Sequence, residues 1–402
     1  MVVLFPVLDN LLFWSKPTET ENALVRLGNP LASDGHSGRA LNVWDLKAFD
    51  DKIYVAGGST VENSGPINIW AYNPATQQFE QEGNVNEEAI ELFRIFDEQL
   101  YIPAADAIEG DSHKFYRRNV DGNWQLLQST SVELAHVRDL IKLDTGKVLL
   151  VGNNRHTKDL SKPAMAVTDD YGQTFQKAGI ENPPDEEFNW FFSVFPYQGK
   201  IYAPTSLLKD SANESGTIAV FNPETNAFEL DPTLSNSEFI PQSHFEQQGG
   251  KQGFYVIYRP WHPIEYKDAL VYPARSYSYY DENYKQAYMN SIGFYVKPAP
   301  GVAPFEVSFP DGKSVGEDVL VIDEALYVVA NRKIANNKFV VYVYKTDNPV
   351  EPGRWQEVLK FKSRNRVRAF EYLDGNFYFG LGQNYDEPIG KSGEILSLQT
   401  NL

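Results

Sequence analysis

A short pattern that recurs along the whole chain constrains its fold more than any other feature. Residues 43–60, VWDLKAFDDKIYVAGGST, consist of an apolar strand, a polar turn at Asp50-Asp51-Lys52, and a second strand that ends in small residues. The apolar pair that opens the second strand returns every 47 to 69 residues, at Ile53-Tyr54, Leu100-Tyr101, Val148-Leu149, Ile201-Tyr202, Leu270-Val271, Leu326-Tyr327 and Phe377-Tyr378. A period near 50 residues with about four strands per unit is typical of a propeller blade. The sequence therefore predicts an all-β, seven-bladed β-propeller of four-stranded antiparallel blades.

The third and fourth strands of each unit are predicted from turn residues and aromatic residues. Residues 72–79 (YNPATQQF) and 221–228 (FNPETNAF) are near copies, in which Asn-Pro begins the turn and an aromatic residue packs between blades. Other fourth strands are expected to begin at Trp124, Phe175, Phe305 and Trp355. The fifth unit has a longer, proline-bearing connection after residues 255–260, so its strands are the hardest to assign.

The last unit has room for only three strands, because the chain ends with SGEILSLQTNL. Residues 22–28 resemble the outer strands of the other units. We therefore expect a strand at about 22–28 to pair with residues 394–400 and close the ring, which removes an open sheet edge. This divides the chain into an N-terminal extension (1–20) and a single propeller domain (21–402). The extension is expected to pack against the outside of the ring or to bind a partner.

Composition excludes several classes of function. The net charge of −18 opposes binding to nucleic acid or to an anionic membrane surface. The absence of cysteine excludes disulfides and Cys-ligated zinc, and the six histidines have no ligand spacing, so we expect no metal site and no cofactor. No stretch is long enough to span a membrane, and the N-terminus lacks the basic region of a classical signal peptide. We expect a soluble protein, and its compartment stays open.

One turn carries a known pattern. Thr168, Asp170, Gly172, Thr174 and Phe175 fit Ser/Thr-x-Asp-x-Gly-x-Thr-Trp/Phe. Asp170 is expected to accept backbone N–H bonds across the turn, and Gly172 to take the positive-φ position. The segment resembles the Asp box of sialidase-like propellers, where the box is structural and lies away from the active site. The resemblance covers eight residues and implies a propeller turn.

Sialidase chemistry is not carried over by this resemblance. Sialidases use three arginines, a Tyr/Glu nucleophile pair and an early Arg-Ile-Pro, whereas residues 93–96 lack the proline and Tyr258-Arg259-Pro260 comes late. The predicted innermost strands nevertheless place charged residues around the central channel. The candidates for acid–base chemistry are Asp45, Glu91, Arg138, Asp139, Glu317 and Arg368. Carboxylates about 5–10 Å apart can act in glycoside hydrolysis; the alternative is that these charges pair with one another across a solvated channel.

A tyrosine-rich stretch offers a candidate recognition surface. Residues 275–288 (RSYSYYDENYKQAY) are interpreted as a long loop with flat, amphipathic rings suited to sugars or protein surfaces, although such alternation also suits a plain β-strand. The residues predicted to bind a ligand are Trp44, Trp190, Tyr258, Arg259, Tyr277, Tyr279 and Tyr280.

Turn and packing motifs recur in this sequence, and a fold alone implies no chemistry. We therefore predict a non-catalytic recognition or scaffold propeller that binds a glycan or protein partner through its loop face. The alternatives are a sialidase-like glycoside hydrolase that uses carboxylates at the channel mouth, and a structural component of a larger assembly.

Overall fold

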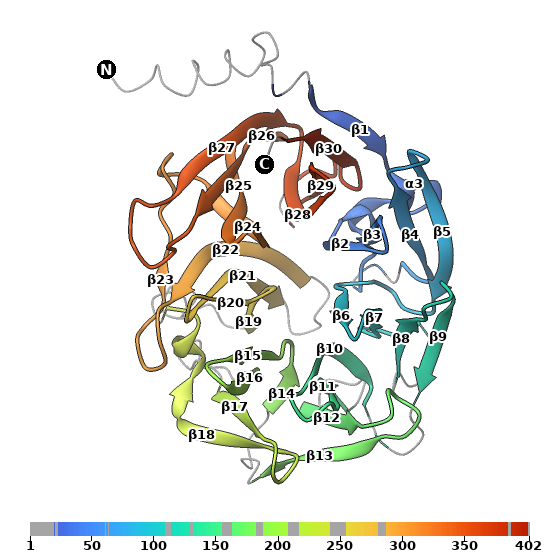
Figure 1. The fold of residues 1–402 in the computed structure, drawn as a ribbon, viewed down its shortest axis with the longest axis vertical. Helices are drawn as coiled ribbons and strands as arrows, with labels where there is room; N and C mark the ends of the chain where they lie inside the picture. The colour runs from blue at the N-terminus through green and yellow to red at the C-terminus, as the bar shows by residue number, and fades with distance from the viewer. Residues whose placement is uncertain are drawn as a thin grey trace.

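The fold was analysed in a computed structural model. It describes residues 20, 23–60, 62, 64–108, 114–128, 132, 134–154, 163–181, 188–207, 217–241, 255–279, 287–384 and 387–400. Antiparallel sheets stand around a central axis like the blades of a propeller (Figure 1), and the innermost strand of each borders the channel. Short helical segments with described bounds occur at α3 (Pro30–Ser33), η1 (Gly38–Leu41) and η3 (Asn236–Glu238).

Five of the sheets are separate from one another. The first contains β2 (Asp45–Phe49), β3 (Lys52–Ala56), β4 (Ile67–Asn73) and β5 (Gln78–Val85). The second contains β6 (Arg94–Phe96), β7 (Gln99–Pro103), β8 (Lys114–Arg118) and β9 (Trp124–Gln128). The third contains β19 (Tyr255–Pro260), β20 (Ile264–Tyr266), β21 (Ala269–Tyr279), β22 (Ala287–Lys297) and β23 (Phe305–Glu306). The fourth contains β24 (Val315–Ile322), β25 (Ala325–Ala335), β26 (Lys338–Thr346) and β27 (Gln356–Ser363). The fifth contains β28 (Arg366–Leu373), β29 (Asn376–Gly382), β30 (Ile395–Gln399) and β1 (Val25–Gly28).

The remaining strands form one nine-stranded sheet rather than two separate blades. Its strands are β10 (His136–Lys142), β11 (Val148–Asn153), β12 (Pro163–Thr168), β13 (Gln176–Glu181), β14 (Phe188–Phe191), β15 (Phe195–Tyr197), β16 (Lys200–Leu207), β17 (Thr217–Asn222) and β18 (Ala227–Ser235). The outer strands β13 and β18 pair in parallel, from Gly179↔Ala227 to Glu181↔Glu229. Each strand thereby covers the edge that the other would leave open. The prediction of seven separate blades is therefore not met in this part of the ring.

The inner hairpins form because their turn residues adopt positive φ. Asp50 and Asp51, at φ 51° and 56°, join β2 to β3. Two consecutive positive φ values define the type I′ turn, whose twist matches that of the flanking strands, and Asp and Gly tolerate this conformation. The same two-residue turn returns at Asp97-Glu98, Gln198-Gly199, Lys267-Asp268, Asp323-Glu324 and Asp374-Gly375. These turns all lie at one end of the channel, which we call the turn end; the opposite end is the loop end.

The predicted closure of the ring is confirmed. Strand β1 pairs antiparallel with β30 through Val25↔Ser397, Arg26↔Leu396 and Gly28↔Ile395. Side chains reinforce the junction, since Arg26 forms an ion pair with Glu394 at 2.6 Å. The paired residues begin at Val25, three residues later than predicted. Residues 1–19 of the predicted extension lie outside the described part of the chain.

Aromatic turns connect the third and fourth strands as the two near copies predicted. The rings of Tyr72 and Phe79 lie 5.2 Å apart, and those of Phe221 and Phe228 lie 5.3 Å apart. In the first copy, Asn73 Oδ1 accepts hydrogen bonds from the backbone N–H groups two and three residues later. The predicted starts of the outer strands near Trp124, Phe175, Phe305 and Trp355 agree with β9, β13, β23 and β27 to within one residue.

The turn at residues 168–175 has the predicted hydrogen bonds. Asp170 accepts bonds from the backbone N–H groups of Gln173 and Thr174 at 3.0 and 2.8 Å. Gly172 has a φ of 91°, and a Cβ at this position would lie 2.8 Å from the Phe115 ring. Phe175 packs edge-on against Phe115 of β8, on the neighbouring sheet. Hydrogen bonding and packing thus account for the motif, and its assignment to the sialidase-type Asp box stays a prediction.

The fifth repeat differs most from the prediction. Its innermost strand is broken into β19 and β20 at Trp261-His262-Pro263, where His262 has a φ of 44°. Residues 275–279 belong to β21 and residues 287–288 to β22, so much of the segment predicted as a long loop is strand. Alternating tyrosine and serine suits such a strand because its side chains alternate between two faces.

Deletion of residues 1–28 tests the closure. Removal of β1 leaves the edge of β30 unpaired, so we expect the Tm to fall by roughly 5 °C or more and the protein to self-associate. Calorimetry and light scattering measure both effects. Deletion of residues 1–19 is the control, because it removes none of the described pairing. Equal Tm values for the two truncated proteins would contradict the closure.

Candidate functional site

Buried aspartates tie neighbouring innermost strands together at the channel. Asp45 of β2 accepts a hydrogen bond from the backbone N–H of Phe93 at 2.8 Å. Asp139 of β10 accepts one from Val194 at 3.1 Å, and Asp318 of β24 accepts one from Phe370 at 3.0 Å. In each case the donor belongs to the next repeat along the chain. These carboxylates are therefore structural as well as candidate functional groups.

Most charges around the channel are neutralised in pairs. Arg94 binds both oxygens of Asp139 at 2.8 Å, and Glu91 accepts from Arg259 at 3.1 Å while it faces Arg138 at 3.5 Å. Lys47 lies 3.3 Å from Glu371. Three further residues, Arg366, Glu317 and Glu387, form a buried network on the opposite wall. Such pairing offsets the cost of burying each charge.

Guanidinium groups stacked on tryptophan rings fill the channel near its loop end. The guanidinium of Arg275 lies 3.8 Å from the Trp261 ring centre, and that of Arg259 lies 4.3 Å from the same ring. Arg368 lies 4.7 Å from the ring of Trp44. Arg275 also donates to the backbone carbonyl of Arg368 at 3.2 Å and thus reaches from β21 to β28. All five side chains are buried, so they close this part of the channel.

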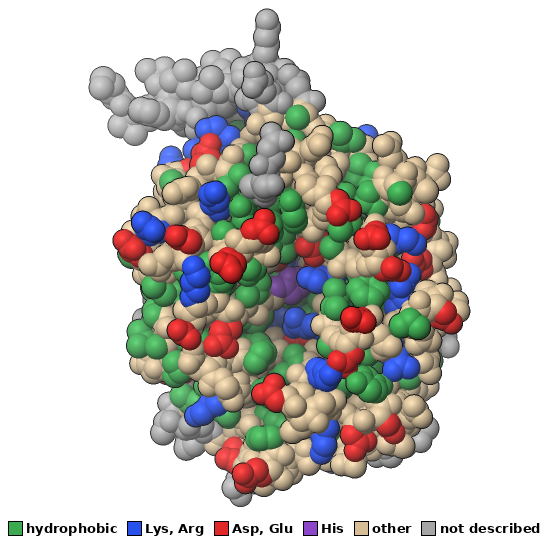
Figure 2. All heavy atoms as spheres, viewed as in Figure 1, with side chains coloured by type: hydrophobic (Ala, Val, Ile, Leu, Met, Phe, Trp, Pro, Cys, Tyr) green, Lys and Arg blue, Asp and Glu red, His purple; other side chains and the backbone are tan. Residues whose placement is uncertain are grey.

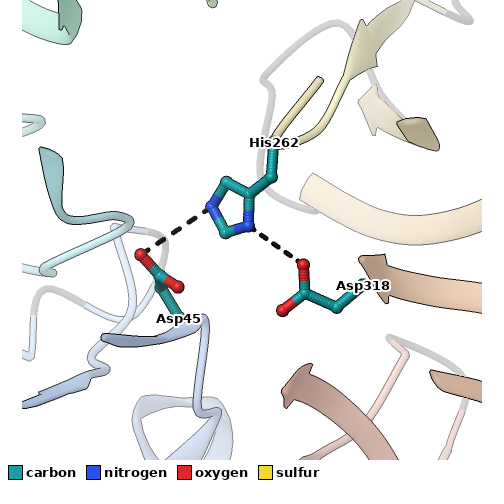
Figure 3. A group of neighbouring side chains, drawn as sticks. All are labelled: Asp45, His262 and Asp318. Atoms are coloured by element: carbon teal, nitrogen blue, oxygen red, sulfur yellow. Dashed lines mark hydrogen bonds and ion pairs between the residues drawn. The ribbon is translucent and has the colours of Figure 1, made fainter. Parts of the chain in front are cut away.

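A histidine and two aspartates meet nearer the turn end (Figure 3). His262 Nδ1 lies 3.1 Å from Asp318 Oδ1, and Nε2 lies 3.8 Å from Asp45 Oδ2. The shorter distance is a hydrogen bond, whereas the longer one is beyond hydrogen-bond range. The break between β19 and β20 places the ring there, because His262 stands where an uninterrupted strand would continue. We call this group the Asp–His–Asp triad.

Burial governs the protonation of the triad. It lowers the pKa of His262 to about 3, and Arg94, Arg275 and Lys47 add to the effect while Asp45 opposes it. Burial raises the pKa of Asp318 to about 7, against the opposing effects of Arg275 and of the backbone N–H groups of Phe370 and Val319. It also raises the pKa of Asp45. Near neutral pH, His262 is therefore neutral and Asp318 can hold or release a proton.

The triad also has the composition of a metal site. Among the described residues, Asp45, His262 and Asp318 each place one candidate ligand atom within 4.8 Å of the others. The two ring nitrogens face different carboxylates, however, and one ion can bind only one of them. The cations that lower the pKa of His262 also oppose a metal ion. The geometry therefore favours proton exchange over metal binding.

The structure gathers the predicted channel residues at the same place. Asp45, Glu91, Arg138, Asp139, Glu317 and Arg368 are all buried around the channel. Trp44 and Arg259 lie in the closed part, next to Arg368 and Trp261. The side chains of Trp190, Tyr258, Tyr277 and Tyr279, and Tyr280 as a whole, lie outside the described part of the structure.

Sequence reasoning missed the roles of His262 and Arg275. A signal was available for His262: the backbone N–H groups of Trp44 and Trp261 donate to equivalent carbonyls, those of Ala56 and Pro273. Trp261-His262 thus occupies the register of Trp44-Asp45. The irregular length of the fifth repeat concealed this match. Arg275 carried no comparable signal, because its contacts with the Trp261 ring and with the backbone of Arg368 depend on packing across the channel.

Comparisons with known proteins support the fold. The sequence model of the Kelch motif matches residues 48–86, which run from the end of β2 to just past β5. No curated protein matches the sequence. The solved structure of the polysaccharide lyase Uly1 is similar with a TM-score of 0.51 and 8% identity over 91% of each chain. Together these results identify a propeller fold that contains a Kelch motif.

Other solved structures are more distant. A chain of a mitotic checkpoint complex has a TM-score of 0.46 and 6% identity over 96% of this chain and 93% of that one. A GH32 β-fructofuranosidase from Bombyx mori has a TM-score of 0.39 and 10% identity over 89% and 88%. These values carry no argument about function.

Within the described residues, no helix is long and apolar enough to cross a membrane.

Substitution of Asp318 tests the protonation of the triad. The pKa of Asp318 is about 7 in the folded protein, whereas the ordinary value of 3.8 applies in the unfolded chain. Between these values the folded chain holds a proton that the unfolded chain has released, so the free energy of unfolding falls as pH rises from about 4 to about 7. We expect Asp318→Asn to flatten this slope. It also lowers stability by about 1–3 kcal/mol, because one backbone N–H loses its acceptor.

Denaturant titrations between pH 4 and 8 measure the slope. Burial also raises the pKa values of Glu87 and Glu88 to about 7, so the informative quantity is the difference between Asp318→Asn and the wild type. Asp144→Asn serves as the control at an exposed aspartate. An unchanged slope in Asp318→Asn would show that this carboxyl group does not titrate in the window.

Proposed function

We propose that this protein is a non-catalytic recognition propeller that binds a protein partner through its loop face. The observation that carries the proposal is the state of the channel: its charges are largely paired, and stacked Arg and Trp side chains close it near the loop end. A catalytic site needs unpaired groups that a substrate can reach. A closed, neutralised channel instead provides a rigid frame for the surrounding loops.

The Kelch motif supports a protein as the partner, because Kelch propellers commonly bind proteins. Strands β19, β21 and β22 supply the surface that we propose. β21 and β22 each have 11 residues, and β19 pairs with β21 from Tyr255↔Tyr279 to Pro260↔Ala274, toward the loop end. Tyr277 and Tyr279 follow Arg275 at two-residue steps, and tyrosine is enriched in protein interfaces. Trp190, Tyr258 and Tyr280 complete the proposed contact set.

We also propose that the nine-stranded sheet consists of two blades, so that the ring has seven. Strands β10 to β13 are connected by antiparallel hairpins in sequence order, as in the separate sheets. Strands β16 to β18 follow the same order. Among the described strands, only the β13–β18 pairing joins the two halves. One domain spanning residues 21–402 follows from this arrangement.

A glycoside hydrolase is the second candidate. The observation in its favour is the triad, where two carboxylates flank His262 and the pKa of Asp318 is raised to about 7 by burial, as a general acid requires. We propose Asp45 and Asp318 as the carboxylate pair, because Glu91 forms ion pairs with Arg259 and Arg138.

Cross-linking mass spectrometry in an extract of the source organism tests the recognition proposal. We expect partner cross-links to map to β21 and β22, and the double variant Tyr277→Ala/Tyr279→Ala to weaken partner binding by at least about tenfold, as loss of interface tyrosines does. The control is Val120→Ala/Leu126→Ala, which removes exposed apolar side chains from the β8–β9 turn and from β9. Unchanged binding in the tyrosine variant would contradict the proposed face.

A glycan array and a screen of polysaccharide substrates complete the test. Glycan binding that is lost in Tyr279→Ala would show that the partner is a sugar rather than a protein. Turnover of a polysaccharide that is lost in Asp318→Asn would establish the hydrolase instead.

A further inference from the structure

The channel is closed near the loop end and opens toward the turn end. Along β2, Trp44 at the strand start is 8% exposed and Asp45 is 3% exposed, whereas the side chain of Lys47, nearer the turn, is 33% exposed. Arg94 on the neighbouring strand, whose side chain is 23% exposed, occupies the same register as Lys47, since each pairs with a tyrosine of the second strand, Tyr101 and Tyr54. Accessible surface in the channel therefore lies on the turn side of the triad.

Figure 2 shows a hollow at the centre of one face of the ring, in which a histidine and Lys or Arg side chains are visible. Of the channel residues named above, Lys47, Arg94 and His262 keep the most exposed side chains, and that of His262 is 15% exposed. Two cations and a polar ring thus line the accessible part of the channel.

The acidic partners of these cations are withdrawn from solvent. The side chain of Asp139, which binds Arg94, is fully buried, and that of Glu371, which binds Lys47, is 9% exposed. Each ion pair therefore presents its positive end to the hollow. The exposed surface of the hollow is basic although the protein carries a net charge of −18.

Both cations retain donors for a ligand. Arg94 uses Nε and Nη2 on Asp139, which leaves Nη1, and Lys47 has a single ion pair among the described residues, to one oxygen of Glu371. The carboxylates that bind Arg94 and Lys47 are themselves anchored to the backbone. Asp139 also accepts from the N–H of Val194, and Glu371 accepts from those of Ala48 and Tyr372, so both cations are held in place. Donors held in this way are ready to bind an anion without much loss of entropy.

We infer that the turn end of the channel binds an oxyanion group, a carboxylate or a phosphate, between Lys47 and Arg94 and above the His262 ring. A small ligand with one or two charges fits this hollow, because two cations among the described residues face it. A polyanion is disfavoured, since it would also meet the acidic surface around the ring. This site is separate from the proposed partner surface at the loop end.

Thermal stability in the presence of small anions tests the inference. Inorganic phosphate and acetate are titrated at constant ionic strength, with chloride as the replaced ion. We expect a saturable rise in Tm with at least one of them, because a ligand that binds only the folded state stabilises it. The comparison between phosphate and acetate identifies the preferred oxyanion. Absence of a saturable shift with both would overturn the inference.

Variants locate the site. Lys47→Gln should weaken anion binding at least tenfold, and Lys47→Arg should restore it. The matched control is Lys142→Gln, which makes the same change at a lysine paired with Asp97 outside the hollow. Equal anion binding by Lys47→Gln and the wild type would show that the anion binds elsewhere.

Amine acetylation of the wild-type protein gives a readout that needs no variant, in case Lys47→Gln does not fold. Saturating anion should slow acetylation of Lys47, measured by mass spectrometry, and leave that of Lys142 unchanged. Equal rates for Lys47 with and without the anion would contradict the site.

Discussion

The carboxylate that accepts a backbone N–H from the next repeat is the interaction on which the channel depends. Asp45, Asp139 and Asp318 each make this contact from a buried position on an innermost strand. A buried carboxylate is costly unless hydrogen bonds and counter-charges surround it. Partner groups therefore surround these carboxylates. Arg94 forms an ion pair with Asp139, and His262 lies between Asp45 and Asp318. The buried carboxylates of the channel therefore serve first to join neighbouring sheets.

The triad is the exception within this neutralised arrangement. Asp45 and Asp318 have no Lys or Arg ion partner among the described residues, and burial lowers the pKa of the histidine between them, which keeps it uncharged. A proton on Asp318 then takes the place of a counter-charge, which is why the pKa of this group is raised. Because these two carboxylates also hold backbone N–H groups of the following repeats, a change of protonation acts directly on the contacts between sheets.

Local sequence signals predicted the repeating part of the fold and not its exceptions. Turn residues such as Asp50-Asp51 identified the inner hairpins because certain residue types favour the positive φ values that these turns need. The closing strand near Val25 was found because the last repeat lacked one. The β13–β18 pairing could not be predicted, since it depends on how two outer edges approach in space. The role of His262 was hidden because the proline-bearing connection after residues 255–260 gives the fifth repeat an irregular length.

The charged residues around the channel were predicted from strand register, whereas the packing along the channel axis was not. Asp45, Glu91, Arg138 and Glu317 were expected around the central channel, but the stacking of Arg275 and Arg259 on Trp261 near the loop end was not predicted. Burial of this kind depends on how long side chains pack across the channel, which no strand pattern encodes. The loop end and the turn end of the channel therefore suit different ligands. A closed loop end suits binding of a partner across a broad face, while an open turn end, with its carboxylates covered and its cations exposed, suits a small anion.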